Sequence, residues 1–334
     1  MNSFGRLFRV SVFGESHGAK VGVIIDGCPA GIAVNKDDFK KDLSRRKSGA
    51  KGTTPRIEPD TPEIVSGIFN GYTTGSPITI LFSNNNTRSS DYNFSDVPRP
   101  GHADFVANRK FNGFNDPRGG GHFSGRITAG LVAAGVIAKK ILGKIDIKAT
   151  LTEAGGTQNI EKAIDEALQQ GDSIGGVVEC RATGLPVGPG EPFFDPVESL
   201  ISHAVFAIPA IKGIEFGSGF NAAKMKGSEH NDAFTNETGK TATNHAGGIN
   251  GGITNGNELV FRVAVKPTSS ISKPQETFDF TAGKQTTLNI QGRHDTCIAL
   301  RIPVIIEAVT AMVLADLMLI DKSIRASSPQ PDDH

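Results

Sequence analysis

The sequence predicts an α+β fold in which sheets and helices pack in layers. Strand-like and helix-like segments follow one another along the 334 residues without a regular βαβ rhythm, which argues against a doubly wound parallel sheet. No G-x-G-x-x-G follows a strand and opens a helix, so the dinucleotide-binding fingerprint is absent. The segments Gly125–Leu142 and Ile302–Ile320 have helical periodicity and are apolar almost all round, so we expect two central, buried helices.

The first part of the chain carries short strands and one amphipathic helix. We expect strands in "LFRVSVF", "VGVIIDG", "IVSGIF" and "ITILFS", and Asn70-Gly71 between the last two is a strong hairpin signal. In "NKDDFKKDLSRRK", Asn35 can cap a helix whose acidic residues precede its basic ones, as the helix dipole favours.

Further along the chain, helical periodicity recurs in "NIEKAIDEALQQ" and "DPVESLISHAVFAI". A strand beginning near Ile145 precedes the first of these helices, and further strands are expected in "GGVVECRATG", "IKGIEFGSG" and "ELVFRVAVKP". We predict that residues 1–325 form a single domain and that "ASSPQPDDH" at 326–334 is a disordered tail.

Two stretches, residues 83–123 and 227–257, have little periodicity and are rich in Asn, Gly, Ser, His and Arg. Structureless segments of that length are uncommon in compact domains and are either functional or disordered. Disordered segments lack aromatic residues, whereas the first stretch includes Phe105, Phe111 and Phe114. We therefore favour long loops that become ordered around a ligand.

The composition excludes several classes of protein. Arg and Lys number 35, and so do Asp and Glu, so there is no global basic field for nucleic acid. Three widely separated cysteines, Cys28, Cys180 and Cys297, form neither a disulfide framework nor a zinc pattern and suggest a reducing compartment. The N-terminus has no signal-peptide pattern, and we expect "ITAGLVAAGVIA" and "IPVIIEAVTAMVLA" to be too short to span a bilayer. A cytoplasmic protein without a membrane or nucleic-acid partner is expected.

Three basic segments stand out against this balanced charge. "SRRKSGAKGTTPR" from Ser44 to Arg56 has no acidic residue, and it is either a solvated basic face or a cradle for a polyanion. "VPRPGHADF" and "DPRGGGHFSGR" have a similar composition, and the second leads into a helix N-terminus, where free backbone N–H groups bind anions. Together the segments indicate a local positive basin for a small, multiply charged anion.

The histidines divide into two groups. His17, His102, His122 and His245 lie in Gly-flanked segments, where an imidazole is well placed for acid–base chemistry, whereas His203 lies in an apolar helix and is expected to be structural. No histidine pair has helical spacing or a cysteine partner, so no metal site is expected.

Two short motifs follow the last strands. "KPTSS" at Lys266–Ser270 is either a phosphate clamp or a turn. "GRHDTC" at Gly292–Cys297 places Arg293, His294 and Asp295 before a buried helix, although the arginine and the aspartate could simply pair with each other.

In combination and in order, "GESHG", "LSRRKSG", "RPGHAD", "RGGGHFSGR", "NHAGGINGGITNG", "KPTSS" and "GRHDTC" resemble the chorismate synthase family over roughly residues 5 to 320. The resemblance implies a β-α-β sandwich with helices between antiparallel or mixed sheets, and long active-site loops. It implies a lyase that converts 5-enolpyruvylshikimate 3-phosphate to chorismate by anti-1,4-elimination of phosphate, the last common step of the shikimate pathway to aromatic amino acids. The family needs reduced FMN for this reaction.

The resemblance also implies roles for individual residues. His17 would protonate the leaving phosphate, His102 would be the proton donor to the reduced flavin, and Asp295 would act through Ser16. The substrate anions would bind Arg45, Arg46, Arg99 and Arg126. The FMN contacts would be His122, Phe123, Ser124, Ala210, Gly251, Lys266, Pro267, Thr268, Ser269, Ser270 and Arg293.

The chain departs from the family pattern at two places. His122-Phe123-Ser124 stands where relatives often have Arg-Ser-Ser, and Pro209-Ala210 stands where they have Asn-Ala. Arg46 and Lys51 fall near positions assigned to NADP in relatives. We expect NADPH to be only an external or weakly bound reductant, with a separate flavin reductase as partner, and the resemblance implies a homotetramer.

Two alternatives come from other classes of protein. An FMN- or nucleotide-binding regulatory module would keep the basic cradle but would not need His17, His102 and Asp295 together. A single-stranded RNA binder would use loop aromatics and arginines, but the balanced charge and the absence of an aromatic-rich strand motif argue against it.

Overall fold

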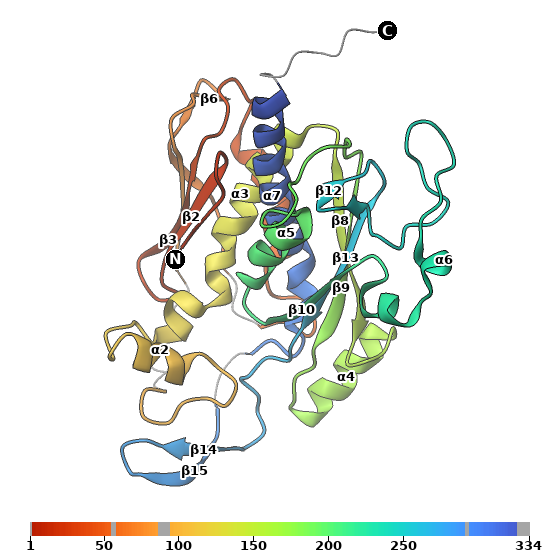
Figure 1. Ribbon diagram of the computed structural model, residues 1–334. Coiled ribbons are helices and arrows are strands. Elements are labelled where there is room, and N and C mark those ends of the chain that lie inside the picture. Colours follow the sequence, from red (N-terminus) through yellow and green to blue (C-terminus); the bar gives the residue numbers. More distant parts are fainter. Residues whose placement is uncertain (1, 55–57, 86–93, 291–293, 326–334) are drawn as a thin grey trace.

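The computed structural model describes residues 2–54, 58–85, 94–290 and 294–325. Two antiparallel sheets enclose a layer of helices, which is the predicted α+β sandwich (Figure 1). The predicted tail at 326–334 and the predicted FMN contact Arg293 lie outside the described residues.

The first sheet has the strand order β1–β2–β3–β7–β4, and every neighbouring pair is antiparallel. Its strands are β1 (Ser3–Phe4), β2 (Arg9–Gly14), β3 (Lys20–Asp26), β7 (Ile78–Ser83) and β4 (Glu63–Ser66). Beside it, the predicted turn at Asn70-Gly71 joins the short strands β5 (Ile68–Phe69) and β6 (Tyr72–Thr73). The expected strand "IVSGIF" is therefore divided between β4 and β5.

The second sheet has the order β10–β13–β9–β8 and is also antiparallel. It consists of β8 (Asp146–Ala154), β9 (Gly176–Thr183), β10 (Ile211–Phe216) and β13 (Leu259–Val265). Helix α4 (Ile160–Gln170) packs on β8, and Asn159 caps its N-terminus. These strands and this helix confirm the sequence-based expectations for this part of the chain.

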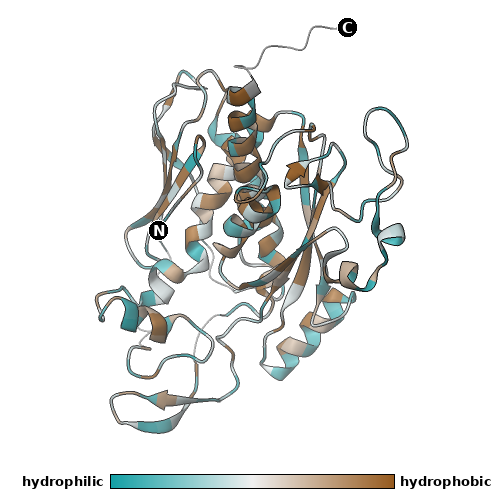
Figure 2. Cartoon of the chain, in the orientation of Figure 1, coloured by the Kyte–Doolittle hydropathy of each residue, from teal (hydrophilic) through white to brown (hydrophobic). Residues whose placement is uncertain are grey.

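The helices between the sheets are α1 (Lys40–Arg46), α3 (Thr128–Leu142), α5 (Val197–Phe206) and α7 (Ile302–Arg325). Helices α3, α5 and α7 are mainly apolar, as Figure 2 shows, whereas α1 is mainly polar. Helix α3 packs on β3 and β7, α7 packs on β8 and β9, and the two helices pack on each other. Their crossing is close: a Cβ at Gly135 of α3 would lie 2.4 Å from the Cβ of Ala308 in α7. Because glycine lets the two backbones approach, both sheets share one hydrophobic core.

Helix α7 corrects one expectation. The segment from Ile298 to Ile324 is long and apolar enough to cross a membrane by length and composition, contrary to the prediction that it is too short. However, 83% of its most apolar window is buried inside the protein. A helix buried between two sheets needs the same composition as a membrane span, so we interpret α7 as a core helix.

Two carboxylates of α7 tie it to distant parts of the chain. Asp316 accepts hydrogen bonds from the backbone N–H groups of Arg6, Leu7 and Phe8, at 2.7–2.9 Å, between β1 and β2. Glu307 accepts two hydrogen bonds from Arg45 of α1, at 2.6 and 2.7 Å, and one from the backbone N–H of Ala149 in β8.

The described parts of the two stretches expected to be long loops are mostly irregular, as predicted, but they also contain short regular elements that were not predicted. The first holds helix α2 (Asp104–Lys110) and a 3-10 segment at Arg118–Phe123. The second holds α6 (Gly227–His230) and the strand pair β11 (Ile249–Asn250) and β12 (Ile253–Thr254). A hairpin of β14 (Gln275–Asp279) and β15 (Lys284–Leu288) was not predicted. These elements are too short for a periodicity of 3.6 or 2 to become visible.

Candidate active site

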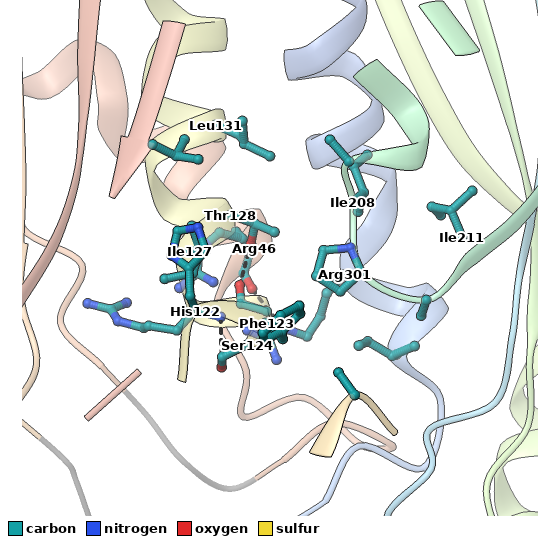
Figure 3. A pocket seen from close by; sticks show the side chains of 18 of the residues that line it. Arg46, His122, Phe123, Ser124, Ile127, Thr128, Leu131, Ile208, Ile211 and Arg301 are labelled. Atoms are coloured by element: carbon teal, nitrogen blue, oxygen red, sulfur yellow. Dashed lines mark hydrogen bonds between the residues drawn. The ribbon is translucent and has the colours of Figure 1, made fainter. Parts of the chain in front are cut away.

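A cavity of about 750 Å³ lies where the first turns of α3, the end of α5 and the start of α7 meet (Figure 3). In the figure, Leu131 lies on the α3 side, and Ile208 and Ile211 lie on the opposite side. The apolar part of the wall includes Val10, Val12, Ile127, Leu131, Ile208, Ile211, Val309 and Met312. This volume falls within the range of roughly 300–1,000 Å³ that is usual for small-molecule sites.

The rest of the cavity wall is strongly basic. Seven Arg and Lys residues line it against three Asp and Glu residues: Arg46, Lys47, Arg99, Arg126, Lys212, Lys266 and Arg301 against Glu58, Asp60 and Asp295. The whole chain has no net charge, so this excess of positive charge is a local property of the cavity. Arginine and lysine in a partly desolvated cavity favour an anion with several charges.

A buried Arg–Asp–Arg group lies on this basic side. Arg46, from the last turn of α1, and Arg126, in the 3-10 turn that precedes α3, each pair with one oxygen of the Asp60 carboxylate. Arg126 also donates from Nε to Asn84 Oδ1 at 2.8 Å, and Ser124 caps the turn that carries it. Burial alone would raise the pKa of Asp60, but the two arginines hold that pKa below its usual value.

Arg46 is 3% exposed, and its Nε and Nη1 atoms are buried without a hydrogen-bond partner among the described residues. A buried guanidinium with unmet donors is costly unless a ligand oxygen or a water satisfies it. The alternative interpretation of this segment as a solvated basic face is therefore wrong for Arg46.

The RPGHAD and KPTSS motifs meet on one side of the cavity. Arg99 donates from Nη1 to Ser270 Oγ at 3.0 Å, and Ser269 Oγ donates to the Gly101 carbonyl at 2.7 Å. Lys266 donates from Nζ to Ser269 Oγ at 2.8 Å, and burial followed by the charge of Lys212 lowers the pKa of Lys266. The hydrogen bonds fix a lysine, an arginine and two hydroxyls side by side, as an anion clamp requires.

Backbone strain is also found at the cavity. Ala210, with φ of 75°, and Asp60, with φ of 48°, are two of the five described non-glycine residues with positive φ, and both line the cavity. The Ala210 carbonyl accepts a hydrogen bond from the backbone N–H of Lys266 at 2.9 Å. Strained residues cluster at functional sites, where the surrounding structure compensates their cost of about 1–3 kcal/mol each.

His17 and Ser16 lie directly behind the cavity wall. Gly119 of the RGGG segment lines the cavity, and a Cβ there would lie 2.5 Å from His17 Nε2 and 2.9 Å from Ser16 Oγ. Only glycine lets this loop lie against both side chains. Ser16 is fully buried and His17 is 8% exposed, and the Ser16 N–H donates to the Gly121 carbonyl at 3.0 Å.

The remaining predicted residues fall into two groups. Those on the cavity wall are Arg46, Arg99, His102, His122, Phe123, Ser124, Arg126, Ala210, Lys266, Thr268, Ser269, Ser270 and Asp295. The structure does not place Arg45, Lys51, Gly251 or Pro267 on this wall, and His245 is also away from it. Lys51 pairs with Asp165, and His245 lies 2.9 Å from Ser218 Oγ. Asp295 accepts a hydrogen bond from the Thr54 N–H at 2.9 Å and lies 3.3 Å from Arg301.

His203, expected to be structural, contacts Phe4 edge to face and also lines the cavity.

Sequence reasoning missed several residues of the site. Asp60 and Asn84 lie in segments without a motif, and their roles depend on pairing with Arg126 over 66 and 42 positions. Asp104 is the last residue of the RPGHAD motif, and His294 belongs to GRHD, so the motifs alone could have predicted both residues. The half-buried His294 ring lines the cavity, and its burial, together with the charge of Arg99, lowers its pKa.

The fold and the cavity define a class: an α+β protein with a basic, partly apolar cavity of small-molecule size between two antiparallel sheets. The model of the family described as "Chorismate synthase" matches residues 8–319. A chorismate synthase of Chitinophaga pinensis is 66% identical over 324 residues, which cover 96% of this chain and 98% of that protein. One of Pyrococcus abyssi is 45% identical over 344 residues, covering 94% and 97%. The chain therefore belongs to the chorismate synthase family, and it is a lyase.

A solved structure supports the same assignment at the level of the fold. The structure entitled "Crystal Structure of Chorismate Synthase" superposes with a TM-score of 0.73 at 26% sequence identity. The match covers 95% of this chain and 93% of that one. The expected fold and family are thereby confirmed.

Proposed function

We propose that this protein converts 5-enolpyruvylshikimate 3-phosphate to chorismate by anti-1,4-elimination of phosphate, with reduced FMN bound. The observation that carries the proposal is the basic cavity, with seven Arg and Lys residues against three Asp and Glu residues. The substrate has a phosphate and two carboxylates, so its charge is complementary to this wall. The unmet donors of Arg46 are suited to one of these anionic groups.

The remaining wall fits a flavin mononucleotide. The apolar side chains around Ile127, Leu131 and Met312 can contact a flat heterocycle, and Lys266, Ser269 and Ser270 can bind a phosphate or a carbonyl edge. Thr268 Oγ1 is buried there without a hydrogen-bond partner among the described residues, which favours a ligand that supplies one. We propose His122, Phe123, Ser124 and Ala210 as further contacts, while Gly251, Pro267 and Arg293 stay predictions.

Reduced FMN, when bound, supplies electron density to the substrate ring, and the reaction is redox-neutral overall. Phosphate leaves with the electron pair of its C–O bond, and we propose that His17 donates the proton that it takes up. A ring C–H bond breaks and its electron pair enters the new double bond. We propose that Asp295 takes up, through Ser16, the proton released at the flavin edge, and that His102 holds a proton at the cavity wall for the flavin. Arg46, Arg99 and Arg126 bind and orient the substrate anions. Arg45 pairs with Glu307 outside the cavity, so we leave it out of this set.

We further propose a cytoplasmic homotetramer whose flavin is reduced by a separate reductase, without a membrane or nucleic-acid partner. The balanced charge and the family support this proposal. NADPH would serve as an external reductant, or bind weakly near Arg46 and Lys51. Light scattering and NADPH oxidation by the purified protein would test these points separately.

The decisive experiment is an anaerobic assay with purified protein, substrate and dithionite-reduced FMN, in which chorismate is followed by its absorbance. We expect product with reduced FMN, and none with oxidised FMN or without flavin. Flavin binding without product would instead favour the regulatory module.

A further inference from the structure

The Asp104 carboxylate supports two groups of the cavity wall at once. Its Oδ2 accepts hydrogen bonds from Arg99 Nε at 2.8 Å and from the Arg99 backbone N–H at 3.2 Å. Its Oδ1 accepts from Arg99 Nη2 at 2.8 Å and lies 2.6 Å from His102 Nδ1. The Asp104 side chain is 8% exposed and does not itself line the cavity.

These contacts determine which nitrogen of His102 carries a proton toward Asp104. Burial alone would raise the pKa of Asp104, but the hydrogen bonds from Arg99 and His102 hold that pKa well below its usual range. An ionised carboxylate only accepts, so at 2.6 Å the Nδ1 atom must be the donor. Arg99 Nη2 lies 3.0 Å from His102 Nδ1, but a guanidinium can only donate, so these two atoms are not hydrogen-bonded to each other. They lie close because both donate to Asp104 Oδ1.

The other ring nitrogen, Nε2, lies beside the RGGG segment, where a Cβ at Gly120 would be 3.7 Å away. Arg99 is fixed at the same time: the Asp104 carboxylate holds one edge of its guanidinium, Phe94 covers its face at 4.3 Å, and Nη1 reaches Ser270. One carboxylate thus sets the geometry of both a histidine and an arginine on the wall.

We propose that Asp104 is a positioning residue that holds His102 with Nδ1–H on the carboxylate and Nε2 toward the cavity, and that holds Arg99 against Ser270. The proposal rests on the proposed function only in assigning His102 and Arg99 to the reaction. A carboxylate behind a histidine fixes the tautomer and the ring orientation, and losing such a partner typically costs 10- to 100-fold in activity.

A purely structural role must be distinguished from this one. Asp104 is the first residue of α2, and an acid in the first turn stabilises any helix through its dipole. Glu161 occupies the first turn of α4, is not on the cavity wall, and provides the matched control. Glu161→Gln should change helix stability alone.

The test uses the full chain with ¹⁵N-labelled histidine and no ligand. In the parent protein we expect a hydrogen-bonded Nδ1–H signal from His102, assigned by its loss in His102→Asn. Asp104→Asn should shift His102 toward the Nε2–H tautomer, whereas Glu161→Gln should leave the signal unchanged. If Asp104→Asn does not fold, Asp104→Glu, which keeps the charge but moves it by one methylene, should weaken the signal. An unchanged His102 signal in the folded variant would overturn the proposal.

Activity provides a second, independent measurement. Asp104→Asn should lower kcat by about 10- to 100-fold in the parent but by a clearly smaller factor in a His102→Ala background, where only its hold on Arg99 remains to be lost. Equal losses in both backgrounds would contradict the His102 part of the proposal. If the parent forms no chorismate at all, the proposed function fails, while the histidine spectra still decide the role of Asp104.

Discussion

Arg45 and Arg46 are neighbours at the end of α1, yet their side chains enter different environments. Arg46 is buried at the cavity and pairs with Asp60. Arg45 turns to the opposite side, where Glu307 accepts both of its terminal N–H groups. Successive side chains of a helix point about 100° apart, so a basic run at a helix end serves two purposes. Arg46 lines the cavity, and the more exposed Arg45 pairs with the buried Glu307 of α7.

This difference gives the first prediction. Arg46→Lys keeps the charge but loses the planar fork, and we expect it to lose about 1.5–3 kcal/mol of transition-state binding. That corresponds to a decrease in kcat/KM of roughly 10- to 150-fold. Arg45→Lys, the control one residue away, should keep kcat/KM within about twofold. Steady-state kinetics on folded variants measures both, and equal effects would contradict the assignment of Arg46.

At this scale, the sequence predicted the arginines and histidines of the wall because they recur in Gly-containing segments that are rich in basic residues. It could not separate Arg45 from Arg46, since the distinction depends on how α1 is rotated against α7. Asp60 was invisible for a similar reason: its partners Arg46 and Arg126 are 14 and 66 residues away, and only the folded chain brings them together.

Among the elements, the two central helices were the most predictable, because long apolar segments have few other places in a fold. Their mode of contact was not predictable. Gly135 and Ala308 lie at the crossing of α3 and α7, and this pair depends on the relative rotation of both helices. Helix α2 was missed because seven residues with few buried side chains carry little periodicity.

The helix crossing gives a second prediction. Gly135→Ala places a methyl group against Ala308, and we expect a loss of about 1–3 kcal/mol in the free energy of unfolding, despite the higher helix propensity of alanine. Adding Ala308→Gly moves the methyl group to the other helix and should restore at least half of that loss. Urea denaturation of the two single variants and the double variant measures this. A neutral Gly135→Ala would show that the helices can move apart without cost.

For the molecule as a whole, the buried Glu307 group joins the helical layer to the second sheet. Glu307 lies on α7, Arg45 on α1, Lys139 on α3, and the Ala149 N–H on β8. Asp42 adds a second carboxylate beside Lys139, at 2.7 Å. Burial alone would raise the pKa of Glu307. The hydrogen bonds from Arg45 and the Ala149 N–H, together with the charge of Lys139, hold that pKa below its usual value.

A lowered pKa in the folded state makes stability depend on pH with a defined sign. The contribution of Glu307 should be complete above the pKa of an unfolded glutamate, about 4.3, and should be lost as the pH falls through the lower folded value. Glu307→Gln should therefore cost about 1–3 kcal/mol at pH 7 and progressively less below about pH 4. Thermal melts from pH 3 to 7 measure the difference. Glu258→Gln, at a half-exposed pair with Arg181, is the control and should cost less than about 1 kcal/mol.

The hydrogen bonds from Asp316 to residues 6–8 have a consequence for how the chain is made. Helix α7 leaves the ribosome after every other described element, yet it forms the middle layer on which the second sheet packs and it fixes the connection between β1 and β2. The second sheet cannot bury its inner face before that moment, whereas the first sheet can already pack on α3. During translation, the nascent chain therefore carries one sheet with an exposed apolar face, and chaperones that bind such surfaces should associate with it until α7 emerges.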